Sequence, residues 1–317
     1  MPPPNQRMKL TARGGRLMGN GSSCLRSPQA AAYARFVRRH ETFGPMATLT
    51  TIAVLPLLTV PLLAQQASYR FPPNDTLKYR EVTESRIELR TQQGTVTLTP
   101  RHDAIIALAT DRGDTVMAWY EALTLSSVGP QGEWRPSTNA ALNLPFRLVV
   151  TRGGQVTTVS LPSFPPEIAS RTDLTRQFED FFISLPLSGL RPQATWADTL
   201  ESTRATSPGD TYHSRHVRRY RALRDTVLAG GLGAVVIAFE QEITVRSSSP
   251  MPNAPVTIHT RLEGREEGTA VFAPASARLL WRVRRGRLEG EQVLRGEGRE
   301  MTVPMSYEYS SSLDALR

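Results

Sequence analysis

Cysteine is almost absent from this 317-residue chain, and its single copy, Cys24, lies near the start. Disulfides, zinc–thiolate centres and cysteine nucleophiles are therefore excluded from the rest of the protein. The usual catalytic patterns are missing as well, since the sequence holds no Gly-x-Ser-x-Gly, Ser-x-x-Lys or His-Glu-x-x-His. The composition indicates no cofactor, and nothing in it indicates an enzyme.

Lysine is also scarce, with only Lys9 and Lys78 beside abundant arginine. The formal charge of +9 is concentrated at one end of the chain. Residues 1–64 hold eight of the 38 basic residues and one of the 29 acidic residues, which leaves 30 against 28 in the remainder. A net charge of +2 on that remainder does not predict a nucleic-acid surface.

The first 64 residues read as a leader. Residues 1–45 are rich in Pro, Gly, Ser and Arg without apolar periodicity, which predicts a disordered and mis-annotated extension. Residues 46–64 contain a 13-residue apolar run from Ile52 to Ala64, typical of a signal peptide cleaved after Ala64. A membrane anchor is the alternative, but the run is shorter than the roughly 20 residues of a spanning helix. We therefore expect export to the periplasm or beyond, with no membrane-spanning part after cleavage.

Residues 65–317 are expected to form a single β-rich domain. Short runs of β-branched and apolar residues alternate with turn residues such as Gln93-Gly94. Short connections between successive strands predict an antiparallel sheet. The expected strands are 77–90, 95–99, 104–110, 115–125, 146–151, 155–161, 195–202, 212–228, 234–246, 256–263, 268–272, 278–287, 291–294 and 301–310.

The segment Pro165–Leu190 is the only one with a clear helical period, and the helix is expected near 167–185. Ser170 and Asp173 have the spacing of a capping box. An apolar stripe follows at helical steps and comprises Leu174, Phe178, Phe181, Phe182 and Leu185. A single amphipathic helix needs a sheet to cover its stripe. The predicted fold is α+β, mostly β, with a large curved antiparallel sheet, a half-barrel, wrapped on one long central helix.

The order of these elements resembles uncharacterised secreted bacterial proteins and, more distantly, the lipoprotein-carrier folds of the LolA and LppX type. The similar features are 182–186, 196–199, 220–240 with a Gly-rich turn, and 268–287. The resemblance implies a hydrophobic groove between sheet and helix that holds an acyl chain, with no catalytic residue. The ligand-binding residues would be Leu174, Phe178, Phe181 and Phe182. The alternative is that this stripe is plain core.

The run 213–224 is basic and contains an aromatic residue. Arginines beside an aromatic ring can follow an anionic polymer. Because an exported protein rarely meets nucleic acid, an anionic envelope component is the expected partner. The candidate partner-binding residues are Arg215, Arg218, Arg219, Tyr220 and Arg221. The alternative is a solvated strand face that discourages edge pairing.

Histidine offers the best metal candidates: His213 and His216, with Asp210 and His259 elsewhere. A three-residue step on a strand points two side chains to opposite faces, so one ion cannot bind both. No metal site is predicted.

Two classes of function remain open at this stage. The first is a secreted, non-enzymatic envelope protein that binds a lipid or other apolar ligand between sheet and helix. The second is a structural or interaction module with a solid core and arginine-rich strands that bind a partner. A hydrolase ranks third, because no carboxylate is isolated in apolar sequence. The oligomeric state is not indicated.

Overall fold

The computed structural model describes residues 67–73, 75–205, 210–228, 230–251, 254–296 and 298–316. The predicted leader, signal peptide and cleavage site fall on residues 1–66 and lie outside this range. Among the residues described, no helix is long and apolar enough to cross a membrane.

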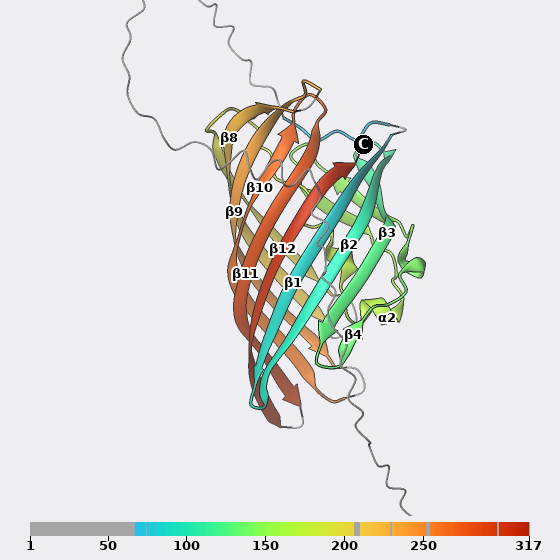
Figure 1. Ribbon diagram of the computed structural model, residues 1–317, viewed down its shortest axis with the longest axis vertical. Coiled ribbons are helices and arrows are strands. Elements are labelled where there is room, and N and C mark those ends of the chain that lie inside the picture. Colours follow the sequence, from blue (N-terminus) through green and yellow to red (C-terminus); the bar gives the residue numbers. More distant parts are fainter. Residues whose placement is uncertain are drawn as a thin grey trace, which may run out of the picture. The chain divides into compact units, whose positions relative to one another are not determined.

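One antiparallel sheet of 12 strands forms almost all of the described fold (Figure 1). Its order is β6-β5-β3-β2-β1-β12-β11-β10-β9-β8-β7, with β4 paired to β3. Most neighbours are hairpins, and the last strand returns to pair with the first. The strands are β1 (Thr76–Thr91), β2 (Gly94–Arg112), β3 (Thr115–Gly129), β4 (Gly132–Trp134), β5 (Phe146–Val150), β6 (Val156–Ser160), β7 (Thr195–Arg204), β8 (Thr211–Val227), β9 (Gly233–Pro250), β10 (Thr257–Ala273), β11 (Arg278–Gly296) and β12 (Arg299–Leu316).

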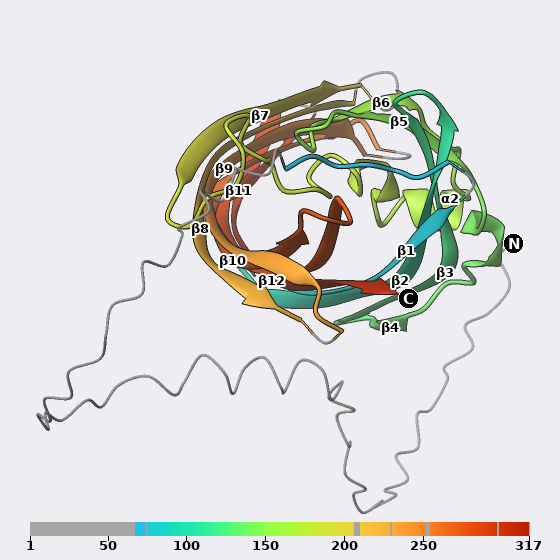
Figure 2. The same cartoon turned by 90° about the horizontal axis from the view of Figure 1, so that it is seen from above.

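Seen from above, the sheet curls around a lumen (Figure 2). Its end strands β6 and β7 line one cleft of about 850 Å³, and Arg204 on β7 donates a hydrogen bond to Thr158 on β6 at 3.1 Å. No backbone pairing joins these two strands in the described residues. The sheet is therefore a barrel with one unpaired seam.

Three pairs of expected strands are single long strands, β2, β10 and β11. Pro100 lies inside β2, where the pairing with β1 is interrupted between Arg101 and Leu98. The missing N–H of Pro100 therefore loses no hydrogen bond to β1. Gly264 on β10 and Gly290 on β11 lie very close to the backbone of the neighbouring strand. A Cβ at Gly264 would lie 2.0 Å from the carbonyl oxygen of Arg287, and a Cβ at Gly290 would lie 1.9 Å from that of Arg261. Glycine here permits close backbone approach in a bent sheet rather than ending a strand.

The predicted central helix is wrong. Residues 161–194, here called the inner segment, contain only one α-helical turn, α2 (Pro166–Ala169), and a 3-10 turn, η2 (Leu174–Arg176). Asp173 caps that short turn by accepting from the Thr175 N–H at 3.0 Å, and Ser170 ends α2. The fold is accordingly almost all β, and the α+β half-barrel on a long helix is corrected.

Side chains of the barrel explain why the helix does not form. The Arg282 guanidinium donates to the carbonyls of Asp180 and Phe181, both at 2.7 Å. The Tyr69 hydroxyl donates to the Ile183 carbonyl at 3.1 Å, and the Trp196 indole donates to the Ser184 carbonyl at 2.9 Å. Backbone groups satisfied in this way do not need helical partners, so the segment stays irregular inside the lumen.

One half of the lumen is filled by aromatic side chains. Phe181 packs edge-on against Tyr79 with ring centroids 5.5 Å apart, and Phe178 meets Phe146 at 4.8 Å. Tyr69 lies between Phe182 and Phe272 at 4.9 Å and 5.2 Å. These rings are buried together with aliphatic residues of nine strands. Burial of this apolar surface fixes the inner segment to the barrel wall.

Candidate functional site

The other half of the lumen contains a cavity of about 910 Å³. Its apolar wall consists of inward-facing residues of β9 to β12, namely Ile243, Val245, Leu262, Leu288, Met305 and Tyr307. The inner segment closes it on the opposite side through Asp173, Leu174 and Gln177. Strand alternation produces this wall, because every second residue of each strand points into the lumen.

A group of charged and polar side chains lies where the cavity meets the filled half. This lumenal charge cluster comprises Glu81, Asp180, Asp198, Arg218, Gln241, Glu266, Arg282, Arg284 and Tyr309. Its members come from seven strands and the inner segment. Charges buried to this degree must be paired and hydrogen-bonded to be tolerated.

Asp180 is the hub on the inner segment. Its carboxylate accepts hydrogen bonds from Arg218 at 2.8 Å, Arg284 at 2.9 Å and Gln241 at 3.3 Å. Arg218 also binds both carboxylate oxygens of Asp198 on β7, each at 2.7 Å. The bidentate pair joins β7 to β8, and the Asp180 bonds join both to the inner segment.

Arg282 is the second attachment point. Besides the two carbonyls of the inner segment, it approaches the Glu81 carboxylate at 3.5 Å. Glu81 is fully buried on β1, where it accepts hydrogen bonds from Ser311 at 3.2 Å and from Gln177. The inner segment is thus held to β1 and β11 by polar contacts as well as by apolar packing.

Glu266 forms the third part of the cluster, on β10. Its oxygens accept from Gln241 at 2.7 Å and from the Tyr309 hydroxyl, with Arg284 at 3.6 Å. Tyr309 reaches it by lying over Gly286, where a Cβ would stand 2.5 Å from the tyrosine ring. The glycine on β11 is therefore a condition for the contact between β12 and β10.

Burial and ion pairing shift the pKa values of this cluster. Burial raises the pKa of Asp180, but Arg218 and Arg284 outweigh it and hold that pKa well below its usual range. For Arg284, burial lowers the pKa, and Glu266 and Asp180 more than reverse the effect. Burial lowers the pKa of Arg282 and of His102. Asp180 stays ionised and His102 stays neutral at pH 7 as a result.

Two polar atoms at the cavity have no hydrogen-bond partner among the residues described. They are Nε2 of His102 on β2 and Nε of Arg284 on β11, and both residues line the cavity. Buried polar atoms without a partner are uncommon in folded proteins.

The residues predicted to bind a ligand lie in the filled half of the lumen. Leu174, Phe178, Phe181 and Phe182 are all buried in the aromatic core. Of these, Leu174 alone lines the cavity.

The arginine-rich run is divided by strand alternation. Arg218 and Tyr220 point inward and are buried, whereas Arg215, Arg219 and Arg221 are exposed on the outer face. Arg215 pairs with Glu201 at 3.0 Å, Arg219 with Glu242 at 3.1 Å, and Arg221 binds the Gln193 side chain. The five predicted partner-binding residues therefore do not share one surface.

The histidine candidates are also separated. His213 contacts Thr203 at 3.0 Å on the outer face, and His216 contacts Gln241 at 3.3 Å in the lumen. The described residues contain no group of three possible metal ligands.

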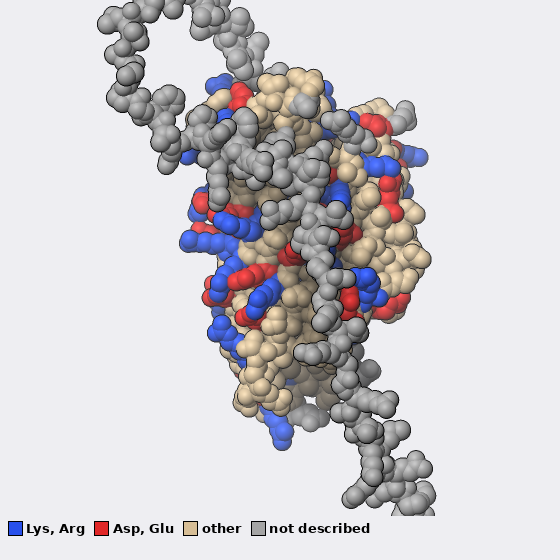
Figure 3. Space-filling view, viewed as in Figure 1, with Lys and Arg blue, Asp and Glu red and all other residues tan. Residues whose placement is uncertain are grey.

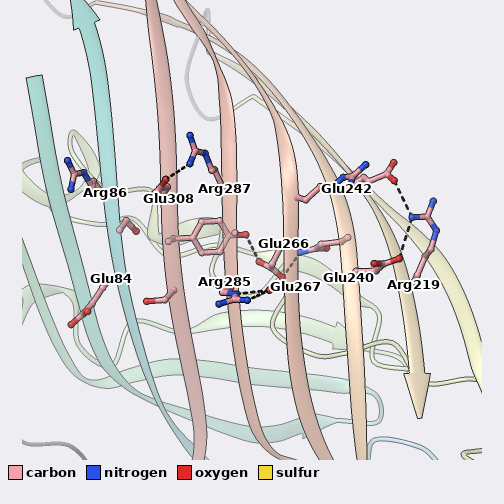
Figure 4. Close-up of a pocket in the computed structure, with 16 residues that line it drawn as sticks. Glu84, Arg86, Arg219, Glu240, Glu242, Glu266, Glu267, Arg285, Arg287 and Glu308 are labelled. Carbon is pink, nitrogen blue, oxygen red and sulfur yellow. Dashed lines mark hydrogen bonds and ion pairs between the residues drawn. The ribbon is translucent and has the colours of Figure 1, made fainter. Parts of the chain in front are cut away.

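The outer face of the same strands is charged. Acidic and basic side chains are interspersed over the visible surface (Figure 3), and a groove of about 780 Å³ crosses β8 to β12 and β1. In Figure 4, Arg219 points toward Glu240 and Glu242, Arg285 toward Glu267, and Arg287 toward Glu308. These cross-strand pairs are exposed, so each contributes little to stability.

Comparison with known proteins gives fold-level likeness only. No family model matches the sequence, and no curated protein matches it. Among solved structures, the OccK2 protein of Pseudomonas aeruginosa is 8% identical with a TM-score of 0.22, over 78% of this chain and all of that one. A BenF-like porin from Pseudomonas fluorescens Pf-5 is 9% identical with a TM-score of 0.23, over 77% of this chain and all of that one.

An outer membrane channel from Pseudomonas putida F1 is 8% identical with a TM-score of 0.20, covering 78% of this chain and 98% of the channel. Export to the cell envelope stays the expectation from the apolar run at 52–64.

These findings correct several expectations. The resemblance to LolA- and LppX-type carriers is wrong, because the described residues contain no long helix that would form the groove. A lipid or apolar ligand between sheet and helix is wrong for the same reason, as is the alternative of a module with a solid core, since the lumen is half open. The expectation of no membrane-spanning part also runs against these outer membrane matches.

Most of the charge cluster was missed in the sequence. No motif marks Glu81, Asp198, Glu266, Arg282 or Arg284 in the sequence. One signal was available, because Glu81 is in phase with the buried Tyr79 on β1, and Glu266 is in phase with the buried Leu262 on β10. A charge in the buried phase of a strand indicates an internal ion pair.

Proposed function

We propose that this protein is an exported envelope protein that binds a small polar solute in the lumen of its barrel. The observation that supports it is the cavity of about 910 Å³, which has an apolar wall on one side and hydrogen-bonding groups on the other. Cavities of roughly 300–1,000 Å³ with a few convergent polar groups are typical of small-molecule sites.

The filled half of the lumen favours binding over free passage. The aromatic core of the inner segment fills that half of the lumen, so a solute that enters the cavity meets the charge cluster. The cluster is rigidly held by its ion pairs, which gives a bound molecule preformed partners at little ordering cost. Nε of Arg284 in the cluster and Nε2 of His102 on β2 are buried without a hydrogen-bond partner among the described residues.

Cavity filling tests the proposal. Leu288 faces the cavity, whereas Val283 on the same strand is 37% exposed on the outer face. A fragment library screened by ligand-observed NMR should give hits with the exported protein that are lost in Leu288→Trp and kept in Val283→Trp. Hits that survive in a folded Leu288→Trp variant, or a screen without hits, would contradict a lumenal site. Circular dichroism of both variants confirms folding.

A further inference from the structure

The two strands that border the unpaired seam, β6 and β7, run in the same direction. Of the 12 strands, β4 lies off the path, which leaves eleven strands from β6 to β7 and ten contacts between them. All ten contacts are antiparallel, and ten reversals of direction return to the starting one. Direct pairing of β6 with β7 would therefore be parallel. One further strand between them would be antiparallel to both and would complete the antiparallel ring.

The free edge of β7 presents backbone groups to the seam. The Ala222 N–H donates to the Ala194 carbonyl at 2.9 Å, and β7 pairs with β8 beyond this point without a register shift. In an antiparallel ladder, every second residue bonds the same neighbour. Residues an even number of positions after Ala194 therefore bond β8, whereas the N–H and carbonyl groups of Glu201 and Thr203 point to the seam.

The free edge of β6 presents backbone groups in the same way. The Thr151 N–H donates to the Gln155 carbonyl at 2.9 Å, so alternation directs the N–H and carbonyl groups of Val156 and Thr158 away from β5. Among the residues described, neither edge has a backbone hydrogen bond across the seam. Rows of unpaired backbone groups on a strand edge are a template for pairing with another chain.

Both edges line the cleft of about 850 Å³, with residues 156–163 on one side and residues 200–205 on the other. The inner segment lies behind them through Glu179, which pairs with Arg204 at 2.7 Å. Glu201 pairs with Arg215 at 3.0 Å on the outer face. The rest of the lining consists of serine, threonine and uncharged apolar side chains. An occupant of this cleft needs no charged side chain.

An extended polypeptide complements both edges. Its N–H and carbonyl groups point alternately to its two sides, at the spacing that a neighbouring strand requires. A second copy of this chain complements them less well, because one edge of its β7 is already bonded to β8. An isolated peptide strand has both edges free.

We propose that the seam binds an extended, uncharged peptide segment of a partner protein, which adds as one strand between β6 and β7 and is antiparallel to both. The paired part of the segment matches the five residues of β6, Val156–Ser160. Recognition by strand addition takes its affinity from main-chain hydrogen bonds. The inference is independent of solute binding in the lumen.

A phage-displayed library of peptides of about seven residues, restricted to uncharged amino acids, tests the proposal. The peptide most enriched on the exported protein is synthesised with both ends capped, and its dissociation constant is measured by fluorescence anisotropy. We expect Thr203→Pro to weaken binding at least about tenfold, because proline removes a seam-facing N–H. Since that N–H does not bond β8, the barrel should stay folded. Thr195→Pro is the matched control, because Thr195 has the same phase on β7 but lies outside the cleft.

Methylation of the peptide backbone gives a second readout, which holds even if Thr203→Pro fails to fold by circular dichroism. Methyl groups on either alternate set of peptide nitrogens should weaken binding to the wild type at least about tenfold, because the added strand bonds both edges. An effect of one set alone would show pairing with a single edge and overturn the insertion.

Three other results would also overturn the proposal. They are a selection without enriched peptides, equal binding by folded Thr203→Pro and Thr195→Pro, and a wild-type dimer in analytical ultracentrifugation that Thr203→Pro converts to a monomer. The last result would assign the seam to a second copy of the chain.

Discussion

The inner and outer faces of β8 to β12 carry the same residue types in opposite roles. Inside, Arg218, Arg282 and Arg284 are nearly buried and hold the inner segment to the wall. Outside, Arg219, Arg285 and Arg287 are more than half exposed and pair across strands in water. Whether an arginine stabilises the fold therefore depends on which face of its strand it occupies, and not on its lying in a basic run.

The largest difference in the free energy of unfolding is expected between the variants Arg282→Ala and Arg285→Ala. Removing Arg282 leaves the buried Glu81 with Arg284, at 3.9 Å, as its nearest cation and two carbonyls without their donor, so the free energy of unfolding should fall by about 3–5 kcal/mol. Arg285→Ala should change it by less than about 0.5 kcal/mol. Urea unfolding measures both. Similar losses in the two variants would refute the distinction between the faces.

A glycine pair gives a contrast of intermediate size. A methyl group at Gly286 would meet the Tyr309 ring and displace its hydroxyl from Glu266, which should cost about 1–3 kcal/mol. Gly233→Ala, where a Cβ meets nothing within 4 Å, is the control and should be near neutral. A neutral Gly286→Ala in thermal unfolding would show that Tyr309 does not need that space.

The pH dependence of stability should follow His102. Because burial lowers its folded-state pKa below the ordinary 6.5, its contribution is fully present above pH 6.5 and is lost as the pH falls through the folded pKa. The unfolding free energy of the wild type should therefore decline between pH 7.5 and 5. His102→Gln should flatten the decline, and the outer-face His213→Gln should not. An unchanged slope in His102→Gln would disprove the assignment.

The smallest effect is expected for the outer ion pairs. Arg219→Ala removes exposed pairs with Glu240 and Glu242 and should cost about 0.5 kcal/mol or less, an amount that 0.5 M salt removes. Unfolding curves at low and high salt measure it. A loss above about 2 kcal/mol that persists in salt would assign the outer groove a structural role.

The sequence determined most strand positions and the turn at Gln93-Gly94, because period-two alternation and turn residues are local signals. It also determined that Phe178, Phe181 and Phe182 are buried, but not the backbone conformation of the segment that carries them. Only the tertiary structure decided that this segment is irregular, since its carbonyls accept hydrogen bonds from Arg282, Tyr69 and Trp196, which lie up to 114 residues away in the sequence. The charge cluster was likewise decided by tertiary structure, because its members approach one another only when the sheet curls.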